Sequence, residues 1–208
     1  MIITIDGPSG TGKTTIARRV AERLNFTYVD TGAMYRAVTY HFLYNERSLE
    51  TFVFEIRVVE GEKHYFVGGE DVTAGIRSPD VTRHVSEVSA HADVRKLMVA
   101  LQRRLAEGTD AVFEGRDMAT FVFPDAELKI YLDASSEVRA ERRYDEFVSK
   151  GLHDIGKDDV LEDILRRDTY DSTRDLSPLR RADDAHYIDT SDLSIDEVVE
   201  DVVSRTRN

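Results

Sequence analysis

The chain has 208 residues, with 28 Lys and Arg against 40 Asp and Glu and a formal net charge of −12. A domain has about 150 residues, so this length fits one domain with an insertion or lid better than two equal domains. The acidic balance argues against a nonspecific nucleic-acid binder, and zero cysteines exclude disulfides, thiolate metal sites and cysteine nucleophiles. Because no apolar run nears the ~20 residues of a membrane span and no secretory signal follows Met1, we expect a soluble, cytoplasmic protein without a membrane partner.

The first quarter of the chain alternates between strand and helix patterns. The predicted elements are a strand at 2–5, a helix at 13–24, a strand at 26–29 and a helix at 31–41. The first strand runs into the turn Asp6-Gly7-Pro8, and Asn25 is expected to end the first helix.

The middle of the chain has a different pattern. Residues 54–59 and 64–67 predict two strands around the turn Glu60-Gly61-Glu62-Lys63, and Gly68-Gly69 closes the second strand. This pattern predicts a small antiparallel insertion. From Pro79 onward, a long amphipathic helical stretch reaches Glu107.

Strand–helix alternation resumes after residue 110. The predicted strands are 111–113, 128–132 and 186–188, and the predicted helices are 136–150, 158–168 and 194–204. Five buried strands separated by helices indicate an α/β fold with a parallel sheet and right-handed crossovers.

One motif carries chemistry by itself. Residues 7–14, Gly-Pro-Ser-Gly-Thr-Gly-Lys-Thr, match G-x-x-x-x-G-K-[ST] between a predicted strand and a predicted helix. Backbone N–H groups of such a loop point at phosphate oxygens, and the helix N-terminus adds a positive dipole end. Lys13 can reach the β- and γ-phosphates, and the Thr14 hydroxyl can ligate Mg²⁺. The residues expected to bind ATP are Gly7, Pro8, Ser9, Gly10, Thr11, Gly12, Lys13, Thr14 and Thr15.

Three polar clusters point to a second site. Residues 30–36 follow the second strand, Glu114-Gly115-Arg116-Asp117 follows the third, and residues 166–174 lie far downstream. Ligands of open α/β sheets bind beyond the carboxyl ends of strands, where the first two clusters fall. A kinase needs a site that holds an acceptor in line with the γ-phosphate and a cationic lid, whereas a hydrolysing switch needs a water-positioning group. The clusters favour a kinase.

Together these motifs resemble bacterial cytidylate kinases, a nucleoside-monophosphate (NMP) kinase family. With Glu70-Asp71-Val72-Thr73 they occur in the family's order and spacing, and the resemblance covers residues 2–202. It implies a P-loop NTPase fold over 1–208 with a five-stranded parallel sheet and flanking helices. It also implies an NMP-binding insertion of antiparallel strands and helices at 45–107, and a short lid at about 139–170. The implied reaction transfers the γ-phosphoryl group of ATP to CMP or dCMP and requires Mg²⁺.

The resemblance also assigns roles to residues of this chain. It implies cytosine contacts at Ser86, Arg95 and Asp117, an acceptor-phosphate clamp at Arg36, Arg116 and Arg174, ribose contacts at Arg167 and Asp171, and nucleotide contacts at Thr31 and Tyr35. The base chemistry agrees, since the 4-amino group of cytosine needs an acceptor such as Asp117. The residues implied to act on the transferring phosphoryl group are Lys13, Arg116, Arg142 and Arg143, with Arg139 as a further lid candidate.

Other interpretations remain open at this stage. Arg139, Arg142 and Arg143 could form ordinary helix-surface ion pairs with Glu137 or Glu141. Likewise, Arg95 could lie on a solvated helix face, and Asp171 could be a polar helix-end residue. Rival functions are a kinase for a hydroxyl acceptor such as shikimate, with Arg36 and Arg116 gripping its carboxylate, and a nucleotide switch. We expect small-molecule nucleotides as partners, no nucleic acid, and a monomer.

Overall fold

A computed structural model describes residues 1–149, 151 and 155–206 of the chain. The chain divides into two compact units. One unit contains residues 1–29 together with 105–208, and the other contains residues 30–104. Within the described residues, no helix combines the length and apolar character needed to cross a membrane.

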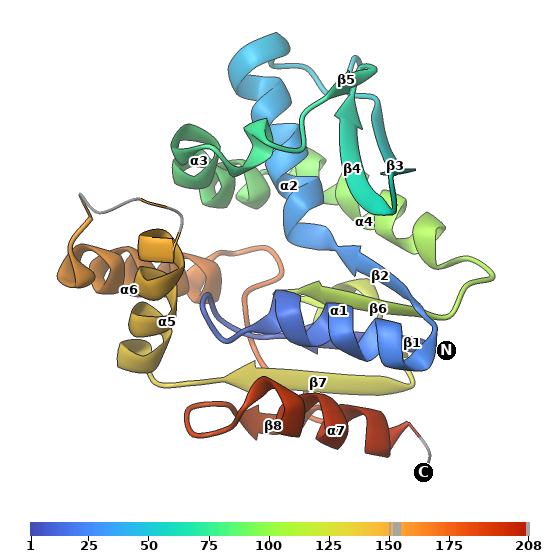
Figure 1. Cartoon of the computed structure of the whole chain (residues 1–208). Helices are drawn as coiled ribbons and strands as arrows, with labels where there is room; N and C mark the ends of the chain where they lie inside the picture. Colours follow the sequence, from blue (N-terminus) through green and yellow to red (C-terminus); the bar gives the residue numbers. More distant parts are fainter. Residues whose placement is uncertain (150, 152–154, 207–208) are drawn as a thin grey trace. The chain divides into compact units, whose positions relative to one another are not determined.

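The first unit is built on a five-stranded sheet (Figure 1). Its strand order is β2 (Thr27–Asp30), β6 (Ala111–Gly115), β1 (Ile2–Asp6), β7 (Leu128–Asp133) and β8 (His186–Asp189). β1 pairs in parallel with β6 and β7, and β7 pairs in parallel with β8. The predicted parallel α/β sheet is therefore confirmed. Its central strand runs directly into the phosphate-loop motif.

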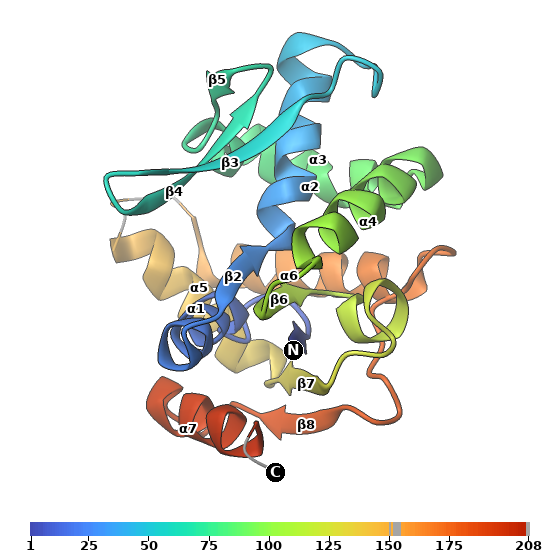
Figure 2. The ribbon, with the colours of Figure 1, turned by 90° about the vertical axis from the view of Figure 1, so that its right-hand side faces the viewer.

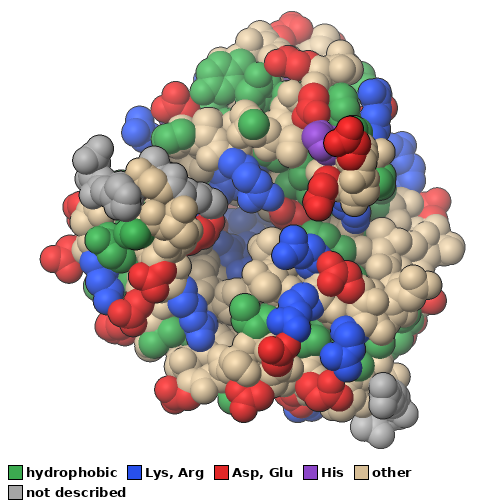
Figure 3. Space-filling view, viewed as in Figure 1, with side chains coloured by type: hydrophobic (Ala, Val, Ile, Leu, Met, Phe, Trp, Pro, Cys, Tyr) green, Lys and Arg blue, Asp and Glu red, His purple; other side chains and the backbone are tan. Residues whose placement is uncertain are grey.

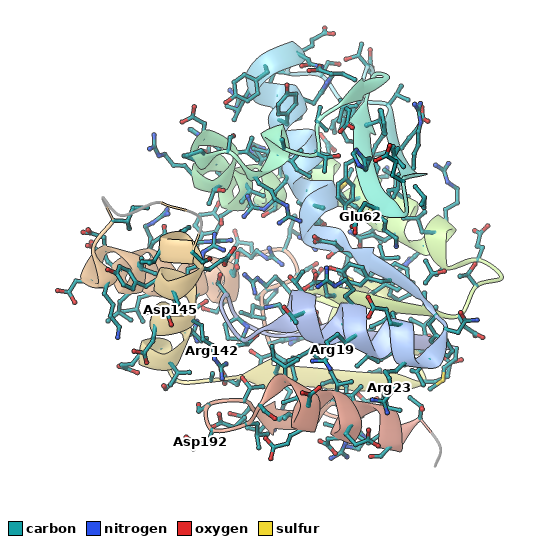
Figure 4. The ribbon with its side chains drawn as sticks, in the orientation of Figure 1. Arg19, Arg23, Glu62, Arg142, Asp145 and Asp192 are labelled. Carbon is teal, nitrogen blue, oxygen red and sulfur yellow. The ribbon has the colours of Figure 1, made fainter. Side chains whose placement is uncertain are left out.

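Two helices cover the same face of this sheet, α1 (Lys13–Leu24) and α7 (Ile195–Arg205), as Figures 1 and 2 show. Their buried residues recur at helical spacing and pack with the inner strands into one apolar core, which explains why both segments fold as helices. Arg19 and Arg23 of α1 reach Asp196 and Glu200 of α7 (Figure 4). Acidic and basic side chains are interspersed over this surface (Figure 3).

The ends of the helices follow local chemistry. Asn25 adopts the left-handed conformation, with φ 56°, and ends α1 as predicted. α5 (Ser136–Ser149) follows β7, and α6 (Lys157–Thr173) extends five residues beyond the predicted end at 168. The reason is that Thr169, Ser172 and Thr173 donate their hydroxyls to carbonyls one turn back, so these residues stay inside the helix.

The second unit combines helices with a small antiparallel sheet. Its elements are α2 (Thr31–Tyr40), η1 (His41–Asn45), β3 (Phe54–Val59), β4 (Glu62–Val67), β5 (Glu70–Asp71), η2 (Gly75–Arg77), α3 (Pro79–Ala90) and most of α4 (Ala92–Ala106). The sheet order is β3-β4-β5, and both pairs are antiparallel; the pair of β3 with β4 was predicted, whereas the short strand β5 was not. Only Glu60 and Gly61 form the hairpin turn, both at positive φ, so the predicted four-residue turn is too long.

The long helix predicted over 79–107 is wrong in one respect, because it is two helices. α3 ends at Ala90, because the backbone of the next residue, His91, is extended with ψ 128°. α4 starts at Ala92, and its first turn is closed by a hydrogen bond from the backbone N–H of Arg95 to the carbonyl oxygen of His91. Apolar spacing continues through the break, and this continuity explains why the pattern predicts a single element.

The boundaries of the insertion (45–107) and of the lid (about 139–170) stay predictions. The observed second unit begins further upstream, at Asp30, and ends at Arg104. Residues 150 and 152–154 of the predicted lid lie outside the described residues.

The inner strand β7 provides a test of the core. Ile130 is fully buried between β1 and β8 in the apolar cluster under α1 and α7. We expect Ile130→Ala to lower the free energy of unfolding by about 2–5 kcal/mol, because it removes buried apolar contacts and leaves a cavity. The control Arg19→Ala removes only an exposed ion pair and should change stability by less than about 1 kcal/mol. Urea unfolding measures both, and equal effects would contradict this packing.

Candidate active site

The phosphate loop joins β1 to α1 and depends on its glycines. Gly7 has φ 150°, and a Cβ there would lie 2.0 Å from the carbonyl oxygen of Leu132. Gly10 has φ 84°, and a Cβ there would lie 2.9 Å from the Cβ of Arg139. The loop can follow this path only without side chains at these positions.

Lys13 is the first residue of α1 and turns back over this loop. Its Nζ donates to the carbonyl oxygen of Pro8 at 2.5 Å and contacts the hydroxyl of Thr11 at 3.4 Å. Burial and the positive charge of Arg116 lower the pKa of Lys13 well below its usual value. An anion bound to the loop would favour the charged form of this amine.

Arg116 links the phosphate loop to the end of β6 and to α6. Its Nη1 donates to the carbonyl oxygen of Gly7, and its Nε lies 3.0 Å from Oδ2 of Asp171. Arg174 follows α6 and faces both acids, 4.0 Å from Oδ1 of Asp171 and 3.8 Å from Oδ1 of Asp117. The structure therefore brings four predicted acceptor-site residues into one buried ionic network beside the phosphate loop.

Arg167 adds a further cation to this region. It is half-buried in α6, and burial together with Arg116 lowers its pKa. The predicted ribose partner Asp171 lies one turn further along the same helix. The positive charge of Arg116 thus helps to lower the pKa of both Lys13 and Arg167, and this gathering of cations is what a site for a phosphate anion requires.

The residues around Thr14 fit a magnesium ion. The Thr14 hydroxyl donates to Oε2 of Glu114 at 3.0 Å, and the hydroxyl of Tyr28 donates to Oε1 of the same carboxylate. Mg²⁺ takes hard oxygen ligands, usually one or two from the protein beside waters and substrate phosphates. A hydroxyl and a carboxylate side by side at the phosphate loop meet that requirement.

The three arginines of α5 that were predicted for the lid have separate partners. Arg139 is buried and donates to the carbonyl oxygens of Ala134 and Ser9 and, at 2.6 Å, to Asp168. Asp168 also lies 3.4 Å from the backbone nitrogen of Ser9, so the pair holds the phosphate loop against α5 and α6.

Arg142 and Arg143 point in different directions. Arg142 donates to the hydroxyl and carbonyl oxygens of Thr190, toward the segment that contains Asp192 (Figure 4). Arg143 pairs with Glu146 three residues on and lies over the Phe147 ring. Arg143 therefore forms a helix-surface ion pair, but with Glu146 and not with the expected Glu137 or Glu141, whereas Arg142 binds backbone and hydroxyl oxygen.

The remaining predicted contacts lie in the 30–104 unit. Buried Arg95 lies with its guanidinium carbon 5.6 Å from the centre of the Tyr35 ring and donates to the carbonyl oxygen of Ser89. Arg36 donates to Thr82 Oγ1 at 2.8 Å and to the Ile76 carbonyl at 3.3 Å. Thr31 begins α2 and is buried, and Ser86 lies in α3, where its carbonyl accepts from the Ser89 hydroxyl. Because Arg95 is buried, the alternative that it lies on a solvated helix face is wrong.

Sequence reasoning missed some of the supporting residues. Glu114 and Asp168 stood in polar clusters that drew attention to their neighbours, and nothing marked Tyr28. Asp6 was visible only as the last residue of a strand, yet its buried carboxylate accepts two backbone hydrogen bonds from distant residues. The one signal for Asp6 in the sequence was a charged residue at the end of an otherwise uncharged strand.

The fold and the site define a P-loop kinase. Among solved structures, a shikimate kinase from Bacteroides thetaiotaomicron matches with TM-score 0.54 and 15% identity, covering 100% of this chain and 99% of that one. A gluconokinase from Sinorhizobium meliloti 1021 matches with TM-score 0.50 and 16% identity, covering 97% and 89%. At this level of identity the likeness shows the fold alone.

Closer relatives establish the family. The cytidylate kinase family profile matches residues 3–208. A cytidylate kinase from Protochlamydia amoebophila is 53% identical over 96% of this chain and 93% of its own length. Another from Halalkalibacterium halodurans is 46% identical over 98% and 96%. The chain belongs to the cytidylate kinase family, and it is an enzyme that phosphorylates CMP.

The contact between Asp168 and the phosphate loop can be tested. We expect Asp168→Ala to raise the KM for ATP about tenfold, because a charged hydrogen bond worth about 1.5–3 kcal/mol is lost and Arg139 is left buried without its acid. The control Asp163→Ala, in the same helix, removes an exposed pair with Arg166 and should leave this KM within twofold. Steady-state kinetics compare the two, and similar values for both variants would contradict the assignment.

Proposed function

We propose that this protein transfers the γ-phosphoryl group of ATP to CMP, and to dCMP, with Mg²⁺ as cofactor. The observation that supports this most is Arg116, a cation that contacts both the phosphate loop and the Asp171–Arg174 network. A phosphoryl transfer needs the donor and acceptor phosphates held within reach of shared cations, because each phosphate repels the other. One guanidinium at the junction of the two sites can serve both.

The donor side consists of the phosphate loop. Backbone N–H groups of the loop, which Pro8 lacks, surround the phosphates, and the N-terminus of α1 adds its dipole. Lys13 exchanges its contact with the Pro8 carbonyl for the β- and γ-phosphates. Thr14 would hold Mg²⁺, with Glu114 beside it, and the bound ion would neutralise phosphate charge.

The acceptor side consists of the residues that the family resemblance implies. Arg116 and Arg174, with Arg36, bind the CMP phosphate, since guanidinium groups match phosphate oxygens in pairs. Asp117 accepts from the 4-amino group of cytosine, while Arg95 and Ser86 donate to its ring acceptors. Asp171 and Arg167 bind the ribose hydroxyls, and Thr31 and Tyr35 complete the nucleotide contacts.

The chemical step is an in-line displacement. An oxygen of the CMP phosphate forms a bond to the γ-phosphorus, while the bond from that phosphorus to the β–γ bridging oxygen breaks and ADP leaves. Lys13 and Arg116 stabilise the charge on the transferring group. Arg142 and Arg143 join them from α5, and the half-buried pair of Arg143 with Glu146 can be exchanged for a phosphate.

An acceptor panel tests the proposal. We expect turnover with ATP, Mg²⁺ and either CMP or dCMP, less with UMP or AMP, and none with shikimate; a coupled ADP assay measures all five. Lys13→Ala should abolish transfer and retain the fold by circular dichroism, because the residue contributes charge at the phosphates. The control Lys157→Ala, which removes an exposed pair with Glu141, should keep normal turnover. Near-normal turnover by Lys13→Ala would overturn the donor-site assignment.

Base selection has its own test. Uracil presents a carbonyl where cytosine has its amino group, so two acceptors, this carbonyl and the buried Asp117 carboxylate, would face each other at a cost of about 1–3 kcal/mol. We expect Asp117→Ala to reduce the CMP:UMP preference about tenfold and to leave the KM for ATP nearly unchanged. The control Asp201→Ala, within α7, removes a half-exposed pair with Arg205 and should behave as the unchanged protein does. A preserved preference would make Asp117 structural.

A further inference from the structure

Asp6 is a buried carboxylate that the reaction described above does not use. It ends β1 and is 1% exposed. One oxygen accepts from the backbone nitrogen of Met118 at 2.9 Å, and the other accepts from that of Ala119 at 2.8 Å. These two residues open the short η3 helix (Met118–Val122).

The position of Asp6 in the chain gives these two hydrogen bonds a consequence. Gly7, the next residue, begins the phosphate loop, and Asp117 directly precedes Met118. The carboxylate therefore fixes the backbone that carries Arg116 and Asp117 to the strand that carries the phosphate loop. The donation of Arg116 to the Gly7 carbonyl is a second link across the same junction.

We propose that ionised Asp6 is a positioning residue, which holds the Arg116–Asp117 segment in the geometry that binds and selects the acceptor. This inference rests on the proposed acceptor roles of Arg116 and Asp117. A carboxylate offers two acceptor oxygens to the two N–H groups, whereas a protonated carboxyl or an amide has one acceptor oxygen and a donor that faces an N–H. Loss of the charge should therefore loosen the segment.

The surroundings of Asp6 put its titration near neutrality. The pKa of Asp6 is raised to about 7. Burial raises this pKa most and the charge of Asp117 adds to the rise, whereas the two backbone hydrogen bonds and Lys13 oppose it. Tyr131 of β7 lies opposite Asp6, whose charge helps to raise the pKa of Tyr131. Lys13 in turn interacts with the charges of Arg116 and Glu114 at the end of β6. Acceptor binding should thus weaken as the pH falls through about 7.

Stability should change with pH in the opposite direction. A raised pKa means that the folded chain binds more protons than the unfolded chain between about pH 4 and 7. The contribution of Asp6 to the free energy of unfolding therefore falls as pH rises through that window. A purely structural carboxylate would not combine this stability trend with better acceptor binding at high pH, so the two readouts separate the roles.

The experiment compares Asp6→Asn with Asp133→Asn. Asp133 also ends a strand of this sheet, but its carboxylate accepts from Ala134 and Tyr187 instead. At pH 8 we expect Asp6→Asn to raise the KM for CMP about tenfold, to reduce the CMP:UMP preference, and to keep the KM for ATP within twofold. Asp133→Asn should leave all three unchanged. Equal rises in both KM values, or identical behaviour of the two variants, would overturn the proposal.

A measurement on the unchanged protein covers the case in which Asp6→Asn does not fold. Cytidine 5′-sulfate keeps its charge from pH 6 to 8, so calorimetry with it excludes titration of the acceptor phosphate. We expect affinity to be several-fold higher at pH 8 than at pH 6, and no change would overturn the proposal. If the unchanged protein fails to phosphorylate CMP, the proposed function fails. If it phosphorylates CMP and Asp6→Asn matches the control, only this inference fails.

Discussion

The contact of Arg116 with the Gly7 carbonyl and the Asp171 carboxylate is the constraint on which the rest of the site depends. It follows from strand register. Asp6 of β1 lies opposite Gly115 of β6, so the residues that follow the two strands, Gly7 and Arg116, leave the sheet side by side. A long guanidinium placed there can reach both the phosphate loop and the C-terminal turn of α6. The parallel sheet thereby places Arg116 between the phosphate loop and α6, at the junction of the proposed donor and acceptor sites.

The positive charges at this junction repel one another in the protein without bound nucleotides. Burial and neighbouring guanidinium groups lower the pKa of Lys13 and of Arg167, which means that each is held in an environment unfavourable to its positive charge. Asp171 and Asp168 offset part of this cost. Bound phosphates would offset more, so binding energy is available from relief of repulsion as well as from new hydrogen bonds. Sites that carry out chemistry are where such unfavourable charge placement is expected.

The sequence predicted the sheet and the phosphate loop well, because both depend on local pattern. β-Branched runs identify strands, and a glycine-rich turn followed by Lys13 and Thr14 has few other uses. Long-range contacts were not predictable in this way. The amides bound by Asp6 lie 112 and 113 residues away, and the carbonyl of Ser9 lies 130 residues from Arg139. Helix α6 also ran past its predicted end, since its hydroxyls bond to the helix backbone rather than capping it.

These misses share a physical cause, and it bears on how the enzyme works. The residues proposed to touch nucleotides stand in recognisable motifs, because phosphate, ribose and base each demand a particular chemistry. The residues that hold them in place, Asp6, Arg139 and Asp168, need only a carboxylate or guanidinium at the correct point in space. Residues with this supporting role follow no fixed spacing in the sequence, so no motif identifies them. Yet the accuracy required of Arg116 and Lys13 comes from these supporting hydrogen bonds, since a displacement of about 1 Å can lower a rate about a hundredfold. Substitutions that alter rate without touching a nucleotide should therefore gather at the strand ends and at the α5–α6 contacts behind the phosphate loop.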